Sequence, residues 1–238
     1  MRILAVADVE CPALWDYFVR GRLDEYDLIL SCGDLKAQYL TFLVTMSHAR
    51  LLYVHGNHDG RYDTTPPEGC EDIDGHLVIY NGLRILGLGG CLLYNKGPHQ
   101  YTERQMQRRI ARLRHAIKKA GGVDVVITHA PPRDLGDLDD YVHRGFEAFR
   151  DLIDQYHPQF FLHGHTHLSY GAGIQREQAS GSTRVINVSE RFSLDISVDE
   201  HFKAEKSGLI YLTRRRRGLA ADSKKDNGSV SVYRIPRP

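Results

Sequence analysis

Cysteine is scarce in this sequence, and the pattern of its few occurrences excludes two kinds of scaffold. Among 238 residues there are four cysteines, and they form neither a CxxC pair nor the close spacing of a disulfide framework. We therefore expect no disulfide-stapled fold and no structural zinc site, and we expect a reducing compartment. The four are Cys11, Cys32, Cys70 and Cys91.

Long apolar runs and an excess of one charge are missing as well. The apolar stretch from Met1 to Ala7 is too short for a signal peptide, and no later stretch approaches the ~20 residues of a membrane span. A net charge of +1 gives no overall preference for nucleic acid or anionic membranes. The chain is long enough to bury a core by itself. We expect one cytoplasmic domain over residues 1–238, and the sequence leaves its oligomeric state open.

Short runs of leucine and β-branched residues recur along the chain, each followed by a polar cluster, and they predict buried strands. Two of the runs are joined by Asn81-Gly82, a dipeptide that tolerates the positive φ angles of a tight hairpin, so this pair is expected to be antiparallel. Because helical stretches alternate with the strands, the pattern predicts an α/β fold with a mixed sheet. The predicted strands are residues 2–7, 27–30, 50–54, 76–80, 84–88, 123–127 and 160–162.

Capping signals place the helices. The segment Thr102 to Gln105 has the form of a capping box, and Gly121-Gly122 is expected to end the helix that it starts. Further helices are expected after Pro12, over residues 35–46, and from about residue 145 to 156. Residues 190–238 read as an irregular C-terminal extension, with a basic turn at 214–217, a solvated loop at 220–228, and a terminal strand at 229–235 that pairs with 208–213.

Five polar clusters contain groups suited to divalent metals, and each follows a predicted strand. Loops at the carboxyl ends of strands converge in open α/β sheets, so the clusters are expected to meet at one site. A glycine before a ligand lets the backbone turn sharply out of its strand. The mixture of imidazole, carboxylate and amide groups fits a pair of transition-metal ions better than calcium. The clusters are Asp8-Val9-Glu10, Gly33-Asp34, Gly56-Asn57-His58-Asp59, Thr128-His129 and Gly164-His165-Thr166-His167.

In this order the clusters resemble the motifs of the calcineurin-like metallophosphoesterases, from Asp8 to His167. The resemblance implies a sandwich of two mixed β-sheets flanked by helices, with two divalent metals at the carboxyl ends of the strands. It also implies hydrolysis of a phosphomonoester or phosphodiester by a metal-bridging hydroxide, with His58 as the catalytic residue beside the leaving oxygen. The implied ligands are Asp8 and His167 for the first metal, Asn57, His129 and His165 for the second, and Asp34 as the bridge.

Two positions depart from the family pattern. Glu10 stands where the family has histidine, and we expect it to bind the first metal as well. Its oxygen favours manganese, with iron, zinc or nickel as alternatives. Ala37 stands where some members have an aspartate that orients the catalytic histidine, so the sequence does not say what holds His58.

Two residues outside the motifs are candidates for substrate binding: His143, at the end of a polar loop, and Arg104, near the start of a basic helix. The other histidines, including His55 and His99, are expected to be solvated or to make local hydrogen bonds. Two other classes of function stay open, a non-catalytic interaction scaffold with the same fold and a nucleic-acid-binding module that uses the arginines at 214–217. The nearly complete set of ligands favours a phosphatase or phosphodiesterase, whose substrate these motifs do not identify.

Overall fold

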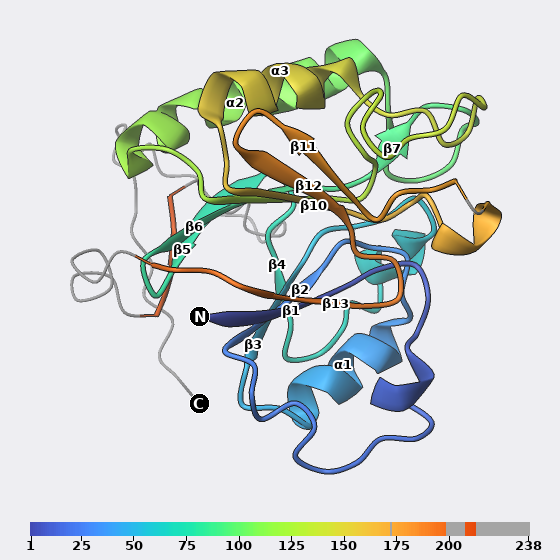
Figure 1. Ribbon diagram of the computed structural model, residues 1–238, viewed down its shortest axis with the longest axis vertical. Helices are drawn as coiled ribbons and strands as arrows, with labels where there is room; N and C mark the ends of the chain where they lie inside the picture. Colours follow the sequence, from blue (N-terminus) through green and yellow to red (C-terminus); the bar gives the residue numbers. More distant parts are fainter. Residues whose placement is uncertain (172, 199–207, 213–238) are drawn as a thin grey trace, which may run out of the picture.

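Two mixed β-sheets pack face to face between helices in the computed structural model, which describes residues 1–171, 173–198 and 208–212 (Figure 1). Helices α2 and α3 cover one sheet, and α1 lies against the other. No helix within these ranges has both the length and the apolarity needed to cross a membrane. The helices are α1 (Ala37–Thr45), α2 (Glu103–Ala120) and α3 (Glu147–Tyr156), and the 3-10 helices are η1 (Pro12–Leu14), η2 (Asp59–Asp63) and η3 (Leu168–Tyr170).

The first sheet has five strands in the order β13-β1-β2-β3-β4. Strands β1 to β4 run parallel, whereas β13 pairs antiparallel with β1. The carboxyl ends of the four parallel strands therefore lie at the same edge of the sheet. The bounds are β1 (Arg2–Val6), β2 (Leu28–Ser31), β3 (Arg50–Tyr53), β4 (Glu71–Asp72) and β13 (Phe192–Asp195).

The second sheet has seven strands in the order β11-β12-β10-β9-β6-β5-β14. The four strands from β12 to β6 are parallel, and β11, β5 and β14 are antiparallel to their neighbours. The bounds are β5 (His76–Tyr80), β6 (Leu83–Leu88), β9 (Val125–Thr128), β10 (Phe160–His163), β11 (Glu177–Ser180), β12 (Thr183–Asn187) and β14 (Leu209–Tyr211), with a separate pair formed by β7 (Cys91–Leu92) and β8 (Gln100–Tyr101).

The central strands are buried on both faces. In β1, Ile3 and Ala5 belong to the core between the two sheets, whereas Leu4 and Val6 pack with η1 and α1. In the second sheet, Val126 of β9 packs instead with α2 and α3. Burial on both faces explains why these strands are continuous apolar runs in the sequence rather than alternating ones.

The capping and turn signals are confirmed. The side chain of Thr102 accepts a hydrogen bond from the Gln105 amide (3.3 Å), and the Gln105 side chain accepts one from the Thr102 amide (2.7 Å). Gly121 ends α2 in the left-handed region. Asn81 and Gly82 both have positive φ and join the antiparallel strands β5 and β6.

The helix predicted after Pro12 is shorter than expected, because the segment forms only the 3-10 helix η1, which has Pro12 in its first turn. The rings of Trp15 and Phe18 instead pack edge-on against Phe42 of α1. Aromatic packing against a neighbouring helix fixes the chain here, and helical hydrogen bonds do not continue beyond η1.

Beyond residue 190, the prediction of irregular structure needs correction at residues 192–195, whereas the strand predicted within 208–213 is confirmed. Residues 192–195 form β13, which completes the first sheet beside β1. Residues 209–211 form β14, which pairs with β5. The predicted strand at 229–235 and the arginines at 214–217 lie outside the described residues. Strand β11 was not predicted, because its residues Glu-Gln-Ala-Ser carry almost no apolar signal.

Candidate metal centre

Four of the predicted ligands meet where parallel strands end. Asp8 follows β1, Asp34 follows β2, Asn57 follows β3, and His129 directly follows β9. Ligand atoms of Asp8, Asp34 and His129 lie within 4.8 Å of one another, and Asn57 contacts His129. We call these four residues the ligand cluster. The two sheets thus bring their polar loops to a common edge.

His129 is the centre of the ligand cluster and is fully buried. Its Nδ1 lies 2.9 Å from the carbonyl oxygen of Cys32, so Nδ1 carries the proton that this oxygen accepts. Its Nε2 lies 3.0 Å from Oδ1 of Asn57 and 3.2 Å from Oδ2 of Asp34. A nitrogen and two oxygens therefore face one another, and a divalent ion accepts this combination of ligands.

Asp34 and His129 each stabilise the charged form of the other. Burial opposes a charge on His129, but Asp34 and Asp8 outweigh burial and raise the pKa of His129 to about 9. Burial likewise opposes ionisation of Asp34, yet the neighbouring His129 charge and hydrogen bond lower the pKa of Asp34 well below its ordinary value. Metal ligation requires a neutral imidazole, so a metal ion would take the place of this proton on Nε2.

Asp8 provides a test of whether the cluster fits a metal. Its Oδ1 accepts a hydrogen bond from the His165 amide (2.8 Å), whereas Oδ2 is buried and has no hydrogen-bond partner in the described part of the chain. Burial raises the pKa of Asp8. A buried carboxylate oxygen without a partner is costly unless a cation pairs with it. The residues present therefore fit a divalent metal ion.

The backbone around the cluster is unusual. Asp8, Asp34 and His165 have φ angles of 64°, 57° and 68°, in the left-handed region that residues other than glycine seldom adopt. Gly56 allows a close approach, because a Cβ atom at this position would lie 2.0 Å from Oδ1 of Asp34. Gly33 has a φ of 92° and makes the turn before Asp34. Conformations of this kind concentrate at functional sites.

Asp59 supports the cluster, and the sequence analysis gave it no role. It is 4% exposed, and its Oδ2 accepts hydrogen bonds from the amides of Gly56 (2.7 Å) and Asp34 (2.8 Å). Burial and the charge of Asp34 raise the pKa of Asp59 to about 6. Its position inside the Gly-Asn-His-Asp motif was the available signal. Asp59 ties the loop after β3 to the loop after β2, and so fixes the distance between Asn57 and Asp34.

Comparison with known proteins identifies the family. The sequence matches the calcineurin-like phosphoesterase superfamily domain over residues 1–190. The chain belongs to this superfamily. The superfamily consists of metal-dependent phosphoesterases, which agrees with the fit of the ligand cluster to a divalent ion.

The chain is also similar to a curated protein and to a solved structure. It is 25% identical over 189 residues to the uncharacterized protein MJ1162 of Methanocaldococcus jannaschii, a match that covers 71% of this chain and 81% of the relative. The crystal structure of TT1561 of Thermus thermophilus has a TM-score of 0.53 at 15% identity and covers 79% of this chain and 89% of that one. At this identity the second likeness shows the fold, a sandwich of two mixed sheets flanked by helices, as the resemblance implied.

Two further predicted ligands lie beside the ligand cluster. The ring of His165 packs edge-on against that of His129, with centroids 4.8 Å apart, and its Nε2 lies 3.0 Å from the carbonyl oxygen of Val142. Burial and the charge of His129 lower the pKa of His165 to about 3, so its ring is neutral, as a ligand must be. The ring of His167 stacks on Tyr170 at 4.7 Å. In the described chain, neither histidine is among the residues whose ligand atoms gather with those of Asp8, Asp34 and His129.

The predicted ligand Glu10 contacts Lys36. Its Oε1 accepts a hydrogen bond from the Lys36 amide (3.4 Å) and lies 3.4 Å from the Lys36 ammonium. It is not among the residues whose ligand atoms gather around His129 in the described chain. Ligation by Glu10 therefore stays a prediction.

The predicted catalytic residue His58 lies over the cluster. Its side chain is 76% exposed, and its Nε2 is 3.9 Å from Oδ2 of Asp34, which is too long for a hydrogen bond. Its amide donates to Oδ1 of Asp34 (2.8 Å). The backbone of His58 is thus fixed at the cluster while its ring is left accessible from solvent.

The two substrate-binding candidates differ in their surroundings. The ring of His143 lies 5.2 Å from that of His165 and 5.0 Å from that of Tyr170, and its Nδ1 contacts both carboxylate oxygens of Asp140. His143 therefore lies at the edge of the site. Arg104 is exposed at the start of α2, and within the described chain no contact joins it to these residues.

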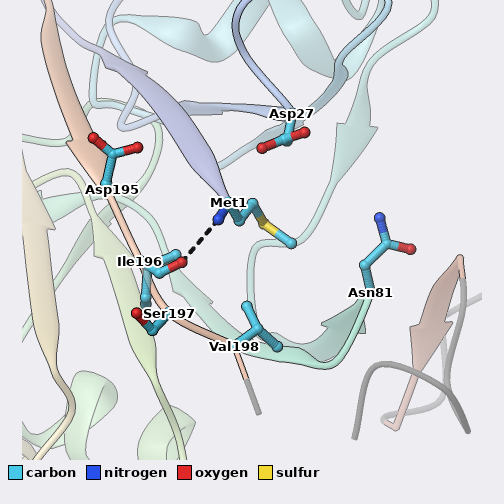
Figure 2. A pocket seen from close by; sticks show the side chains of 7 residues that line it. All are labelled: Met1, Asp27, Asn81, Asp195, Ile196, Ser197 and Val198. Carbon is cyan, nitrogen blue, oxygen red and sulfur yellow. Dashed lines mark hydrogen bonds between the residues drawn. The ribbon is translucent and has the colours of Figure 1, made fainter. Parts of the chain in front are cut away.

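A cavity of about 420 Å³ lies at the other end of the molecule (Figure 2). It is lined by Met1, Asp27, Asn81 and residues 195–198, which lie at the amino ends of β1, β2 and β6. The amino group of Met1 donates to the carbonyl oxygen of Ile196 there (2.9 Å). No group of metal-ligating side chains lies at this cavity within the described residues. Convergent polar atoms, and not cavity size, mark the candidate active site.

Proposed function

We propose that this protein hydrolyses a phosphate ester with two divalent transition-metal ions bound at the ligand cluster. The observation that supports the proposal most strongly is the placement of His129 Nε2 against Asn57 and Asp34, beside an unpartnered oxygen of Asp8. These residues come from four different strand ends, and none needs such neighbours for packing. Manganese is the proposed metal, with iron, zinc or nickel as alternatives, in a cytoplasmic enzyme.

The family's motifs, together with the positions of the residues in the ligand cluster, suggest a role for each side chain. Asp34 would bridge the two ions, since one carboxylate oxygen faces His129 and the other accepts from the His58 amide. Asp8 and His167, with Glu10, would hold the first ion, and Asn57, His129 and His165 the second. The ions would supply an activated water and neutralise the charge of the phosphate during in-line displacement. Asp59 would keep Asp34 and Asn57 at their separation.

His58 is the proposed general acid. Its ring is exposed above the ligand cluster, next to Asp34, and can approach an ester oxygen that leaves from a phosphate bound there. Because Ala37 offers no carboxylate to orient it, the substrate itself would complete its hydrogen bonds. His143 would contact the substrate from the opposite side, where it packs on His165 and Tyr170.

The substrate is proposed to be a phosphomonoester or phosphodiester. A direct test is to reconstitute the purified protein with manganese, iron, zinc or nickel and to measure hydrolysis of nitrophenyl phosphate, bis-nitrophenyl phosphate and cyclic nucleotides. We expect turnover of at least one class with one metal and none in chelator. Undiminished turnover in chelator, or no turnover of any ester despite bound metal, contradicts the proposal. The second result would favour a non-catalytic scaffold.

A further inference from the structure

A second group of potential metal ligands lies apart from the ligand cluster. His55, Asp63 and His99 each offer one ligand atom, and these atoms lie within 4.8 Å of one another. We call these residues the side cluster. His55 follows β3, Asp63 ends η2, and His99 precedes β8. No residue of the side cluster is a proposed ligand of the two ions described above.

In the side cluster, His55 is buried and His99 is half-buried, and each has one buried ring nitrogen without a hydrogen bond among the described residues. His55 has a side chain that is 9% exposed, and His99 one that is 14% exposed. Within the described chain, Nδ1 of His55 and Nε2 of His99 have no hydrogen-bond partner. Their nearest carboxylates are Asp72, 3.9 Å from His55, and Asp63, 4.0 Å from His99. Unpaired buried nitrogens of this kind are rare and call for an explanation.

Packing alone does not explain the arrangement. The two imidazoles stack with their centroids 4.4 Å apart and an angle of 18° between their planes. Apolar side chains at these positions could pack together as well and would leave no unpaired nitrogens. His99 also has a φ of 49°, in the left-handed region. The backbone holds it there, because the His99 carbonyl accepts from the Cys91 amide (3.1 Å). The fold therefore keeps His99 against His55 in spite of the strain in its backbone.

The surroundings of the side cluster carry more negative than positive charge. Asp63, Asp72 and Asp74 lie near the two rings, and Arg109 is the cation that pairs with Asp74. The Asp63 side chain is 66% exposed, so it can turn toward an ion without disturbing the core, and solvent can reach the site from its side.

We propose that the side cluster binds one zinc-like divalent ion through His55, Asp63 and His99, with water as the fourth ligand. Two imidazoles and one carboxylate are a common protein ligand set for zinc. Tetrahedral zinc with bonds of about 2.0–2.1 Å places its ligand atoms roughly 3.3 Å apart. The three ligand atoms would therefore draw closer, and the two stacked rings would turn until the lone pairs of their nitrogens converge on the ion. The ion would join η2, directly after His58, to the segment between β7 and β8.

The first test is metal content. Protein reconstituted with excess zinc and then desalted should hold one zinc ion fewer per chain in His99→Gln than in the wild type, whatever number the ligand cluster binds. His115→Ala is the matched control, because His115 is exposed on α2 and belongs to neither cluster. It should match the wild type. Asp34→Asn should lose zinc from the ligand cluster and still hold the ion that His99→Gln lacks.

A second variant covers the possibility that His99→Gln does not fold. Asp63→Ala changes an exposed side chain, and we expect it to fold and to lose the same single ion. In the wild type, zinc should slow amide exchange in residues 59–63 and 91–101, and it should not do so in Asp63→Ala. Equal zinc content and equal exchange in the wild type and Asp63→Ala would overturn the proposal.

Discussion

The ligand cluster and the side cluster use similar residues but are built differently. In the ligand cluster, side chains bond to one another and to backbone groups, as His129 does with Cys32 and Asp8 with His165. In the side cluster, Nδ1 of His55 and Nε2 of His99 have no hydrogen bonds in the described chain. Hydrogen bonds hold most side chains of the ligand cluster in place before any metal binds, whereas the two unpaired nitrogens of the side cluster would gain a partner only with the proposed ion.

The largest expected effect is at the bridge of the ligand cluster. Asp34→Asn should lower turnover roughly 10³-fold or more, because both ions lose a shared anionic ligand. Loss of a residue that only hydrogen-bonds to a metal ligand already lowers metal affinity or activity by about 10–100-fold. The measurements are steady-state kinetics and elemental analysis. Asp139→Asn, which changes a fully exposed carboxylate, is the control and should leave both unchanged. Normal turnover in Asp34→Asn would contradict the bridging role of Asp34.

The ion pair between Asp74 and Arg109, which lies near the side cluster, should contribute to the stability of the folded protein. Asp74 pairs with Arg109, which also donates to the carbonyl oxygen of Gly89 (2.8 Å) and lies over the ring of Tyr101. Asp74→Ala should cost about 3–5 kcal/mol, the usual result of leaving a buried charge unpaired. Glu177→Ala, which breaks an exposed pair with Arg184, should cost about 0–1 kcal/mol. Urea denaturation of both variants at pH 7 checks the difference.

The pair of Asp74 and Arg109 should also make the stability of the protein depend on pH. Burial opposes ionisation of Asp74, but Arg109 and the Gly89 amide outweigh burial and lower the pKa of Asp74 below its ordinary value of 3.8. Because the folded pKa is the lower one, the stabilisation is present above pH 3.8 and is lost as the pH falls below that value. The free energy of unfolding of the wild type and of Asp74→Ala should therefore converge in strong acid. A constant difference down to about pH 2 would speak against this origin.

His58 gives a smaller and more selective effect on turnover. His58→Ala should lower turnover by about 10²-fold, at the low end of the range of about 10²–10⁴ for a positioned general acid, because its ring is exposed and loosely held. Metal content should not change. The loss should shrink for nitrophenyl esters, whose leaving groups barely need protonation. Equal losses for good and poor leaving groups contradict the acid role.

Glu10 should have the smallest effect. Its carboxylate adds a negative charge that histidine would not, so Glu10→His should keep activity, shift the alkaline optimum downward and raise the relative activity with zinc or nickel by a few-fold. Lys36→Ala provides a second test. Because it removes the present partner of Glu10, it should free the carboxylate and strengthen manganese binding. If Glu10→Ala leaves metal content, metal preference and pH profile unchanged, Glu10 is not a ligand.

Most of the fold could be predicted from the sequence because its signals are local. Thr102 and Gln105 cap α2 through their own neighbours, and the apolar runs of β1 and β9 are buried on both faces. Strand β11 and the turn at Pro12 depend on distant partners instead. Pairing with β12 makes β11 a strand, and Phe42 of α1 holds the segment after η1.

The candidate site also has parts that the sequence predicts and parts that depend on the folded structure. Each member of the ligand cluster follows a strand inside a motif, so order along the chain was enough to group them. The contacts of Glu10 with Lys36 and of His165 with Val142 depend on side-chain rotamers, which motifs do not specify. The side cluster escaped notice because His55, Asp63 and His99 form no motif, and only the folded chain stacks the two rings.

Anomalous diffraction from crystals soaked in manganese would show directly whether two metal ions bind at the ligand cluster. At the ligand cluster we predict two anomalous peaks about 3.5–4 Å apart, a spacing typical of two-metal hydrolases, with Asp34 between them. Asp8 and His167 should lie at one peak, and Asn57, His129 and His165 at the other. A single peak bound by other residues, or no peak at the ligand cluster in protein that still hydrolyses phosphate esters, would contradict the account.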